Sequence, residues 1–434
     1  MRIALFLFFS FIASFLVFAQ NDSIKPLKPV EVKVSGFVMN NLFYDTRKNA
    51  EAADGMILIF PLPVVKDSFE NDMNQVPNIS LLSFASRLRF SIAGQEAFGA
   101  KSSAFIEFDF TARSTQIATA KDNTVASSSS AAAVRFRQGW AKLNWEKGEL
   151  LVGRAWHPLA STDVLPSVMS LNIGVPFQPF NRSEQITYTY MIGKLNMIAS
   201  AIYQNDFINN GPTGKSYLYQ NNTLLPNLHA QLKYKSDNLI AGIGADYKRL
   251  KPKTSVTNYT KKINTTDEIV ECPAFLAFGQ YKKGKLQISG KSILASNPSE
   301  NVMTGAYGTY ALDTLSGIEK YTPFKHFFIW GNIAYGEKLK VSLFAGYLKN
   351  LGTSKNLIPH SKTNPTVFGL GETIGEMVRV TPTLSYTSGK MTLALELEHN
   401  ITTYGSIDHN NKGKIINTND ITGTRVLACM LYNF

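Results

Sequence analysis

The final stretch of the chain, Gly423–Phe434, reads GTRVLACMLYNF and alternates between the two faces of an extended strand. One face carries the side chains of Val426, Ala428, Met430, Tyr432 and Phe434. Such a strand could close a transmembrane barrel by pairing with the first strand of the chain. It could equally be an edge or core strand of a soluble sandwich. The rest of the sequence decides between these two interpretations.

The same alternation recurs in segments of about ten residues, the length that a transmembrane strand needs. The clearest segments are 82–92, 104–110, 186–203 and 228–247. The pattern predicts about sixteen strands. We expect them to begin near Glu31, Ile79, Ala100, Ala133, Glu149, Glu184, Lys194, Pro226, Leu239, Pro273, Lys285, Lys325, Lys338, Thr373, Lys390 and Gly423.

The segment 134–146 departs from simple alternation. Arg135 and Arg137 share one phase of the strand, whereas Lys142 and Asn144 take the other. An extra residue in one strand of a pair changes the phase in this way. We therefore expect a β-bulge near Gly139.

Very short turns and long polar connections join the segments alternately. The long connections span roughly 45–78, 114–132, 158–183, 205–225, 250–272, 297–324, 350–372 and 405–422. Short turns at one end and long loops at the other are typical of outer-membrane barrels. The face opposite the aliphatic one carries charges such as Arg87, Asp109 and Lys233, whereas a soluble β protein keeps an apolar interior. The sequence therefore predicts an all-β fold, a transmembrane antiparallel β-barrel with short periplasmic turns and long extracellular loops.

The N-terminal residues predict export. Met1-Arg2 is a short positive region, Ile3–Phe18 is apolar, and Val17 and Ala19 stand at the positions that a signal peptidase reads. We expect a cleaved signal peptide at 1–19, a polar periplasmic leader at 20–30 and the barrel at 31–434. The expected location is the cell outer membrane.

The remaining composition excludes several function classes. The net charge of +12 permits nucleic acid, anionic headgroups or anionic solutes as partners, but no basic run interleaved with aromatics supports nucleic acid. The six histidines are scattered without metal-ligand spacing, and no Walker or Rossmann glycine motif occurs. We therefore predict no enzyme activity, metal or cofactor. Cys272 and Cys429 fall on strands far apart around the barrel, so we expect two free thiols.

Several stretches in the first half of the chain carry a family likeness. They are SRLRF at 86–90, EFDF at 107–110, Phe136-Arg137 through Trp145-Glu146, LVGRAWHP at 151–158, Asp163, Pro166, GVP at 174–176 and RSEQITYTY at 182–190. In order and spacing this set resembles the DcaP-like trimeric outer-membrane porins over residues 79–192. Beyond that range only the strand rhythm and the terminal Phe434 match. The leader at 20–30 holds no heptads, so a function tied to the periplasmic coiled coil of some members is not expected here.

The resemblance implies a sixteen-stranded barrel, a homotrimer, and a third long loop folded into the lumen. It also implies that Phe434 is the terminal signal read by the barrel-insertion machinery. If the third loop is 158–183, its apolar and small residues suit a segment lying against the inner wall. We expect Asp163 and Arg182 on this constriction loop, and Glu396 and Glu398 on the opposing wall.

The lumen near that loop is expected to carry charged side chains on neighbouring strands. The predicted pore-lining residues are Arg87, Arg89, Glu107, Asp109, Arg135, Arg137 and Arg154. A ring of arginines favours anions. Alternatively, arginine and carboxylate form a cross-strand ladder in which the charges mainly neutralise one another.

The first long loop contains the run MILIFPLPVV at 56–65, which is too apolar for a free surface loop. It could latch onto a neighbouring subunit or tuck over the mouth of its own barrel.

The leading functional hypothesis is an outer-membrane porin for small hydrophilic, anionic solutes. The alternatives are a substrate-selective outer-membrane channel, or a non-transporting barrel whose loops bind a partner. The expected surroundings are outer-membrane lipid and lipopolysaccharide.

Overall fold

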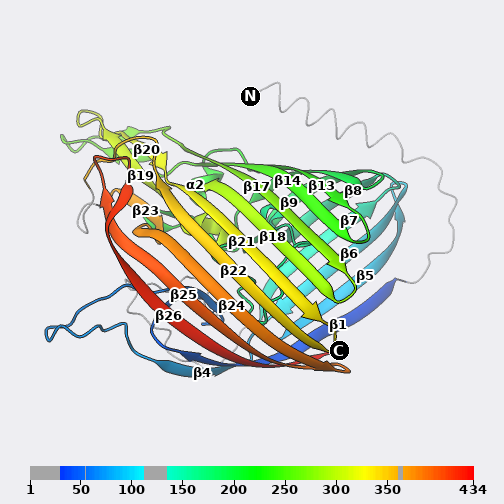
Figure 1. The fold of residues 1–434 in the computed structure, drawn as a ribbon. Coiled ribbons are helices and arrows are strands. Elements are labelled where there is room, and N and C mark those ends of the chain that lie inside the picture. Colours follow the sequence, from blue (N-terminus) through cyan, green and yellow to red (C-terminus); the bar gives the residue numbers. More distant parts are fainter. Residues whose placement is uncertain (1–29, 54, 112–133, 360–364) are drawn as a thin grey trace.

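A computed structural model describes residues 30–53, 55–111, 134–359 and 365–434. They form a closed, tilted antiparallel β-barrel (Figure 1). Its sheet contains seventeen described strands, of which β4 and β5 pair with successive parts of β1. These two strands share one position, so sixteen positions surround the barrel. The predicted signal peptide and all of the predicted leader except Val30 lie outside the described residues.

The barrel strands have the following bounds. They are β1 (Glu31–Asp45), β4 (Asn78–Leu82), β5 (Arg87–Ala97), β6 (Ala100–Asp109), β7 (Arg135–Asn144), β8 (Gly148–Trp156), β9 (Arg182–Ile192), β10 (Leu195–Tyr203), β13 (Asn227–Lys235), β14 (Leu239–Leu250), β17 (Val270–Lys283), β18 (Leu286–Ser296), β21 (Lys325–Gly336), β22 (Leu339–Gly352), β24 (Ile374–Ser388), β25 (Met391–Asp408) and β26 (Lys414–Asn433).

Shorter elements lie in the long connections. They are β2 (Asn49–Ala52), β3 (Ile57–Pro61), η2 (Pro158–Ala160), β11 (Asn210–Gly211), β12 (Gly214–Lys215), α2 (Leu218–Asn221), β15 (Ser255–Thr257), β16 (Ile263–Thr265), η3 (Ser299–Asn301), β19 (Gly305–Leu312), β20 (Glu319–Pro323) and β23 (Val367–Leu370). Among the described helices, none combines the length and the apolar character that a membrane crossing requires.

The last strand closes the barrel on the first, as the sequence predicts. The β1–β26 pairing runs from Phe37 opposite Asn433 to Asp45 opposite Arg425. Phe434 then exchanges two backbone hydrogen bonds with Gly36, at 3.1 and 3.2 Å. The first and last strands of the barrel are thereby paired, so the sheet has no open edge whose backbone groups lipid could not solvate.

Fifteen of the predicted strand starts lie within three residues of the observed ones, and the exception is β26. It begins at Lys414 instead of Gly423, so the predicted long loop at 405–422 is wrong. β25 and β26 continue as a paired ribbon, with Tyr404 opposite Asn419 and Asp408 opposite Lys414. The polar run Asn417–Asp420 is typical of a loop in sequence, but cross-strand pairing holds it extended.

The predicted bulge lies two residues before Gly139. The β6–β7 register shifts where Glu107 faces Gln138 and the next residue, Phe108, faces Phe136. Arg137 is therefore the extra residue of β7, and it brings a second guanidinium next to the same pair of acids.

The two faces of the wall differ as predicted only in part. The outer face is mainly apolar, with Ile186, Met197 and Ile243 more than half exposed. The inner face is charged on β5, β6 and β7. On β17 to β22 it is mainly apolar, and residues such as Phe328 and Phe344 are fully buried. The polar inner face that the sequence predicts is therefore not continuous around the barrel, because inward-folded loops cover this part of the wall. Both cysteines are buried, unpaired thiols, as expected.

Candidate functional site

The best-defined charged site in the lumen is a cross-strand ladder on β5, β6 and β7. Arg89 Nε donates to Glu107 Oε2 at 2.8 Å. On the other side, Arg135 donates to both oxygens of Asp109, at 3.0 and 2.8 Å. These contacts follow from the strand register, since Arg89 lies opposite Glu107 and Asp109 lies opposite Arg135.

Arg137 joins the two halves of this ladder. Its Nε donates to Glu107 Oε1 and its Nη1 donates to Asp109 Oδ2, each at 2.8 Å. The side chains of Arg137, Glu107 and Asp109 are each no more than 3% exposed. The bulge makes this bridge possible, because the extra residue places Arg137 between the two acids.

Arg87 completes the cluster without an acid of its own. It forms no ion pair of 4.0 Å or less with any described residue, and its Nε is buried without a hydrogen-bond acceptor. Its guanidinium lies 5.2 Å from the centre of the Phe37 ring. Four arginines thus share two carboxylates, and the ladder keeps a surplus of positive charge.

Arg154, the remaining predicted pore-lining residue, forms its ion pairs with acids other than Glu107 and Asp109. It lies opposite Glu184 in the β8–β9 register, and its guanidinium lies 3.5 Å from that carboxylate and 3.4 Å from the buried carboxylate of Asp206. Alternation places Arg154 and Glu184 on the face of Ile186, which is exposed on the outside of the barrel. Local sequence does not reveal the face of Arg154, because the preceding residues 150–153 are apolar or glycine on both faces.

The sequence predicts Arg182 on the constriction loop, but the residue is instead the first of β9. It is fully buried, and its Nη2 donates to Asp206 Oδ2 at 2.7 Å. The rings of Trp156 and Phe180 each lie 4.9 Å from its guanidinium carbon. These contacts give Arg182 a structural environment at the end of the strand.

The third long loop crosses the lumen and contacts the far wall. Asp163 lies in this loop and pairs with Lys233 at 2.5 Å and Lys235 at 3.2 Å. Burial by itself would raise the pKa of Asp163, but the hydrogen bond and charge of Lys233 hold it below its usual value. On β21, Asn332 Oδ1 accepts from the Ser167 backbone N–H at 3.1 Å.

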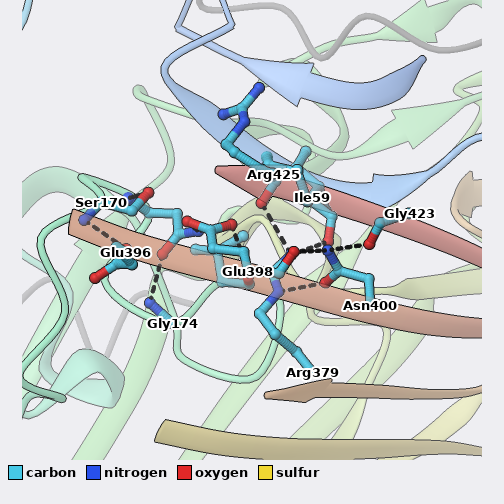
Figure 2. Close-up of polar contacts among 12 residues, drawn as sticks. Ile59, Ser170, Gly174, Arg379, Glu396, Glu398, Asn400, Gly423 and Arg425 are labelled. Atoms are coloured by element: carbon cyan, nitrogen blue, oxygen red, sulfur yellow. Dashed lines mark hydrogen bonds and ion pairs between the residues drawn. The ribbon is translucent and has the colours of Figure 1, made fainter. Parts of the chain in front are cut away.

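Glu396 and Glu398 hold the same loop. Glu396 accepts from the backbone N–H groups of Met169 and Ser170, at 2.5 and 2.9 Å. Asn172 Nδ2 donates to both oxygens of Glu398 at 3.0 Å. Figure 2 shows both carboxylates against the loop. Both glutamates are buried on β25, and groups of the third loop cover their carboxylates.

Apolar contacts also hold the third loop against the barrel wall. Phe177 packs against Phe344 with ring centres 6.2 Å apart, and Trp330 lies 5.9 Å from Phe344. Trp330 Nε1 also donates to Gln178 Oε1 at 3.1 Å. Leu159, Val164 and Val175 of the loop are buried in the same cluster. These contacts explain why the inner face of β21 and β22 is apolar.

The apolar first loop tucks into its own barrel. Leu58 and Ile59 are fully buried, and Ile59 belongs to the same apolar cluster as the third loop. Tyr404 on β25 donates to the Pro61 carbonyl at 2.7 Å. The buried part of the run 56–65 thus lies in its own barrel, whereas Val64 and Val65 at its end are exposed.

A second buried polar cluster lies at the base of the third loop and has no sequence signature. His157 Nδ1 accepts from the Leu159 backbone N–H at 3.1 Å, and its Nε2 lies 3.0 Å from Asn227 Nδ2. Burial lowers the pKa of His157 to about 4. Asp246 lies 3.2 Å from His229 Nδ1. No group of three or more His, Cys, Asp or Glu with metal-binding geometry occurs among the described residues.

Comparison with known proteins supports the fold without a close relative. The chain matches no protein-family model, and it matches no curated protein. Among solved structures it is similar to the outer membrane channel DcaP of Acinetobacter baumannii, with a TM-score of 0.63 and 14% identity. That match covers 93% of this chain and 97% of the channel.

Two further outer-membrane proteins share the architecture. The outer-membrane expressed OmpT of Vibrio cholerae aligns with a TM-score of 0.53 and 12% identity, over 95% of this chain and all of that one. The anion-selective porin from Comamonas acidovorans aligns with a TM-score of 0.51 and 12% identity, over 94% of this chain and all of that porin. At these identities the likeness is one of fold, and it agrees with the DcaP-like barrel predicted from residues 79–192.

Proposed function

We propose that this protein is an outer-membrane channel for small hydrophilic solutes, with a preference for anions. The observation that carries the proposal is the ladder of β5 to β7, where four lumenal arginines face two carboxylates. Guanidinium groups in a pore attract anions and repel cations. The formal net charge of +12 acts in the same direction at longer range.

The proposed environment is the outer membrane, with lipid and lipopolysaccharide around the barrel. An apolar outer face on closed, fully paired strands is what lipid requires. Phe434 ends the outer face of β26 beside Tyr432. We propose it as the terminal residue that the insertion machinery reads.

A homotrimer is the proposed assembly. One solved form of the Vibrio cholerae OmpT, which has the same architecture at 11% identity, is described as a trimer. For this chain a trimer remains a proposal, which the mass of the detergent-solubilised protein would test.

A substrate-selective channel is the second candidate. The observation in its favour is that two loops occupy part of the lumen and bury side chains there, which narrows the route available to a solute. A selective channel binds its solute, so uptake into liposomes saturates with concentration. A general porin gives uptake that rises in proportion to concentration.

The decisive test is conductance and reversal potential of the purified protein in planar bilayers under a salt gradient. The wild type is expected to conduct and to select anions. The double variant Arg87→Gln/Arg89→Gln removes two lumenal charges and leaves the bridge between Arg137 and the two acids intact. Its reversal potential should shift toward cations.

An unchanged reversal potential in a conducting double variant would contradict the anion filter. A wild-type protein without any conductance would contradict the channel itself, and would favour a barrel whose loops bind a partner. The proposal includes no catalytic step.

A further inference from the structure

The hairpin β2–β3 is an unusual occupant of a barrel lumen because it is a separate two-stranded sheet. Its strands pair only with each other, from Asn49 opposite Pro61 to Ala52 opposite Ile57. The carbonyls along the free edge of such a ribbon need donors when they are buried. Water cannot supply these donors where Leu58 and Ile59 are fully buried.

Side chains of the barrel wall supply them. Arg379 Nη2 on β24 donates to the carbonyls of Leu58 and Ile59, at 3.2 and 2.9 Å. Arg425 Nη1 on β26 donates to the carbonyl of Gly55 in the hairpin turn at 2.8 Å. With the bond from Tyr404 to Pro61, three wall residues hold the hairpin along its length.

Arg379 also binds the third loop. Its Nη1 donates to the carbonyl of Val175 at 2.5 Å, and its Nε donates to Asn400 Oδ1 at 2.5 Å. Glu398, which holds Asn172 of that loop, lies 3.8 Å from Arg379 Nη1. Figure 2 shows Arg379 pointing toward Ile59 and Asn400, beside Glu398. One guanidinium therefore connects two inward-folded segments to the same wall.

The chemistry suits a brace. Arginine presents donors in a rigid planar fork that stays charged, so it can satisfy several fixed carbonyls at once. Burial of such a charge is costly unless every donor finds a partner. Each of the three guanidinium nitrogens of Arg379, Nε, Nη1 and Nη2, has a hydrogen-bond acceptor. An apolar residue would fill the space, but it would leave the edge carbonyls of Leu58 and Ile59 unpaired.

We propose that the β2–β3 hairpin is a second constriction element, and that Arg379 is the positioning residue that fixes it against the third loop. The two segments together then set the cross-section of the channel, and the hairpin closes the side of the lumen next to β24, β25 and β26. This inference rests on the proposed channel function.

The test compares single-channel conductance of three proteins with the wild type. Arg379→Met keeps the length of the side chain and removes its donors. A second variant replaces residues 50–62 by a short Gly-Ser linker. Arg249→Gln is the control, because Arg249 lies on the outward face of β14, where it pairs with Glu271.

We expect the hairpin deletion to raise conductance by about 1.5-fold or more, since conductance follows the open cross-section of a pore. Arg379→Met should give noisier open-channel current and a smaller increase, and Arg249→Gln should leave both unchanged. If the wild type conducts but the deletion does not change its conductance, the second constriction is disproved. A wild type without conductance would instead disprove the channel function.

A labelling experiment tests the brace without relying on current. Leu58→Cys is introduced into a protein in which Cys272 and Cys429 are replaced by serine. A polar thiol reagent should modify this cysteine at least about tenfold faster after Arg379→Met, because the hairpin then opens locally. Equal labelling rates with and without Arg379 would overturn its positioning role. This test does not depend on whether the hairpin-deletion variant assembles.

Discussion

The wall formed by β5, β6 and β7 and the wall formed by β18, β21 and β22 both face the lumen, but different interactions stabilise them. The first wall pairs charges between adjacent strands, and its partners are 18 to 30 residues apart in sequence. The second wall is mainly apolar, and loops cover it. Its ties reach further, since Trp330 and Gln178 are 152 residues apart.

This difference teaches which parts of a barrel lumen can be read from a sequence. Adjacent strands share a register, so alternation of charge on both strands predicts a ladder. Where a loop covers the inner face of a strand, that face becomes apolar like the outer one. The strand then no longer alternates between polar and apolar residues. Three further predictions distinguish the two walls by the interactions that stabilise each of them.

The largest effect is expected for Arg137→Met. It leaves Glu107 and Asp109, both buried, without their shared partner, and breaking a buried ion pair in this way costs about 3–5 kcal/mol. The temperature at which the folded barrel is lost in a heat-modifiability gel should fall markedly. Arg89→Met is the matched control, because the Arg89 side chain is 33% exposed and such a pair contributes about 0–1 kcal/mol. Equal effects of the two changes would contradict the central role of Arg137.

The loop-covered wall is tested by Gly346→Val. A side chain at Gly346 would approach Phe177 Cδ2 of the third loop to 2.5 Å, so the loop must move. Overpacking of this kind costs about 1–3 kcal/mol, and the third loop should become more sensitive to limited proteolysis. Gly331→Val is the control, because a Cβ there meets nothing within 4 Å. Increased cleavage in both variants would mean that β-branching itself, and not contact with the loop, is the cause.

Much of the fold could be predicted, because alternation and turn spacing are local properties. The closure of β26 on β1 and the bulge in β7 follow from the phase of single side chains such as Phe434 and Arg137. The pairing of β25 with the first part of β26, residues 414–422, could not be predicted. Polar residues such as Asn417 and Asp420 pair there as readily as they form loops.

The candidate site was predicted less completely. Arg87, Arg89, Glu107 and Asp109 lie together as expected, because they occupy facing positions on neighbouring strands. Glu396 and Arg379 were not recognised as anchors of the loops. Their partners, Ser170 and Leu58, are 226 and 321 residues away in sequence. No local pattern records a contact of this kind, and backbone groups, which every residue has, provide most of the partners.

The smallest effect concerns acid and the base of the third loop. Burial holds the pKa of His157 at about 4, below the ordinary value of about 6.5. Asp246 opposes this shift, whereas His229 and Lys248 add to it. The neutral ring is therefore favoured in the folded state. The stability that it contributes is present above the ordinary pKa and is lost as the pH falls from there toward about 4.

We expect the open-channel current of the wild type to become noisier between about pH 6 and pH 4. His157→Asn keeps a side-chain oxygen that can accept from the Leu159 backbone N–H, as a cap residue does, but it takes up no proton in this range. Its noise should stay constant over the same interval. If the variant and the wild type respond to pH alike, another group controls the loop. Since the barrel wall contains the stronger ionic contacts of Arg137, the mean conductance of both proteins should change less than the noise does.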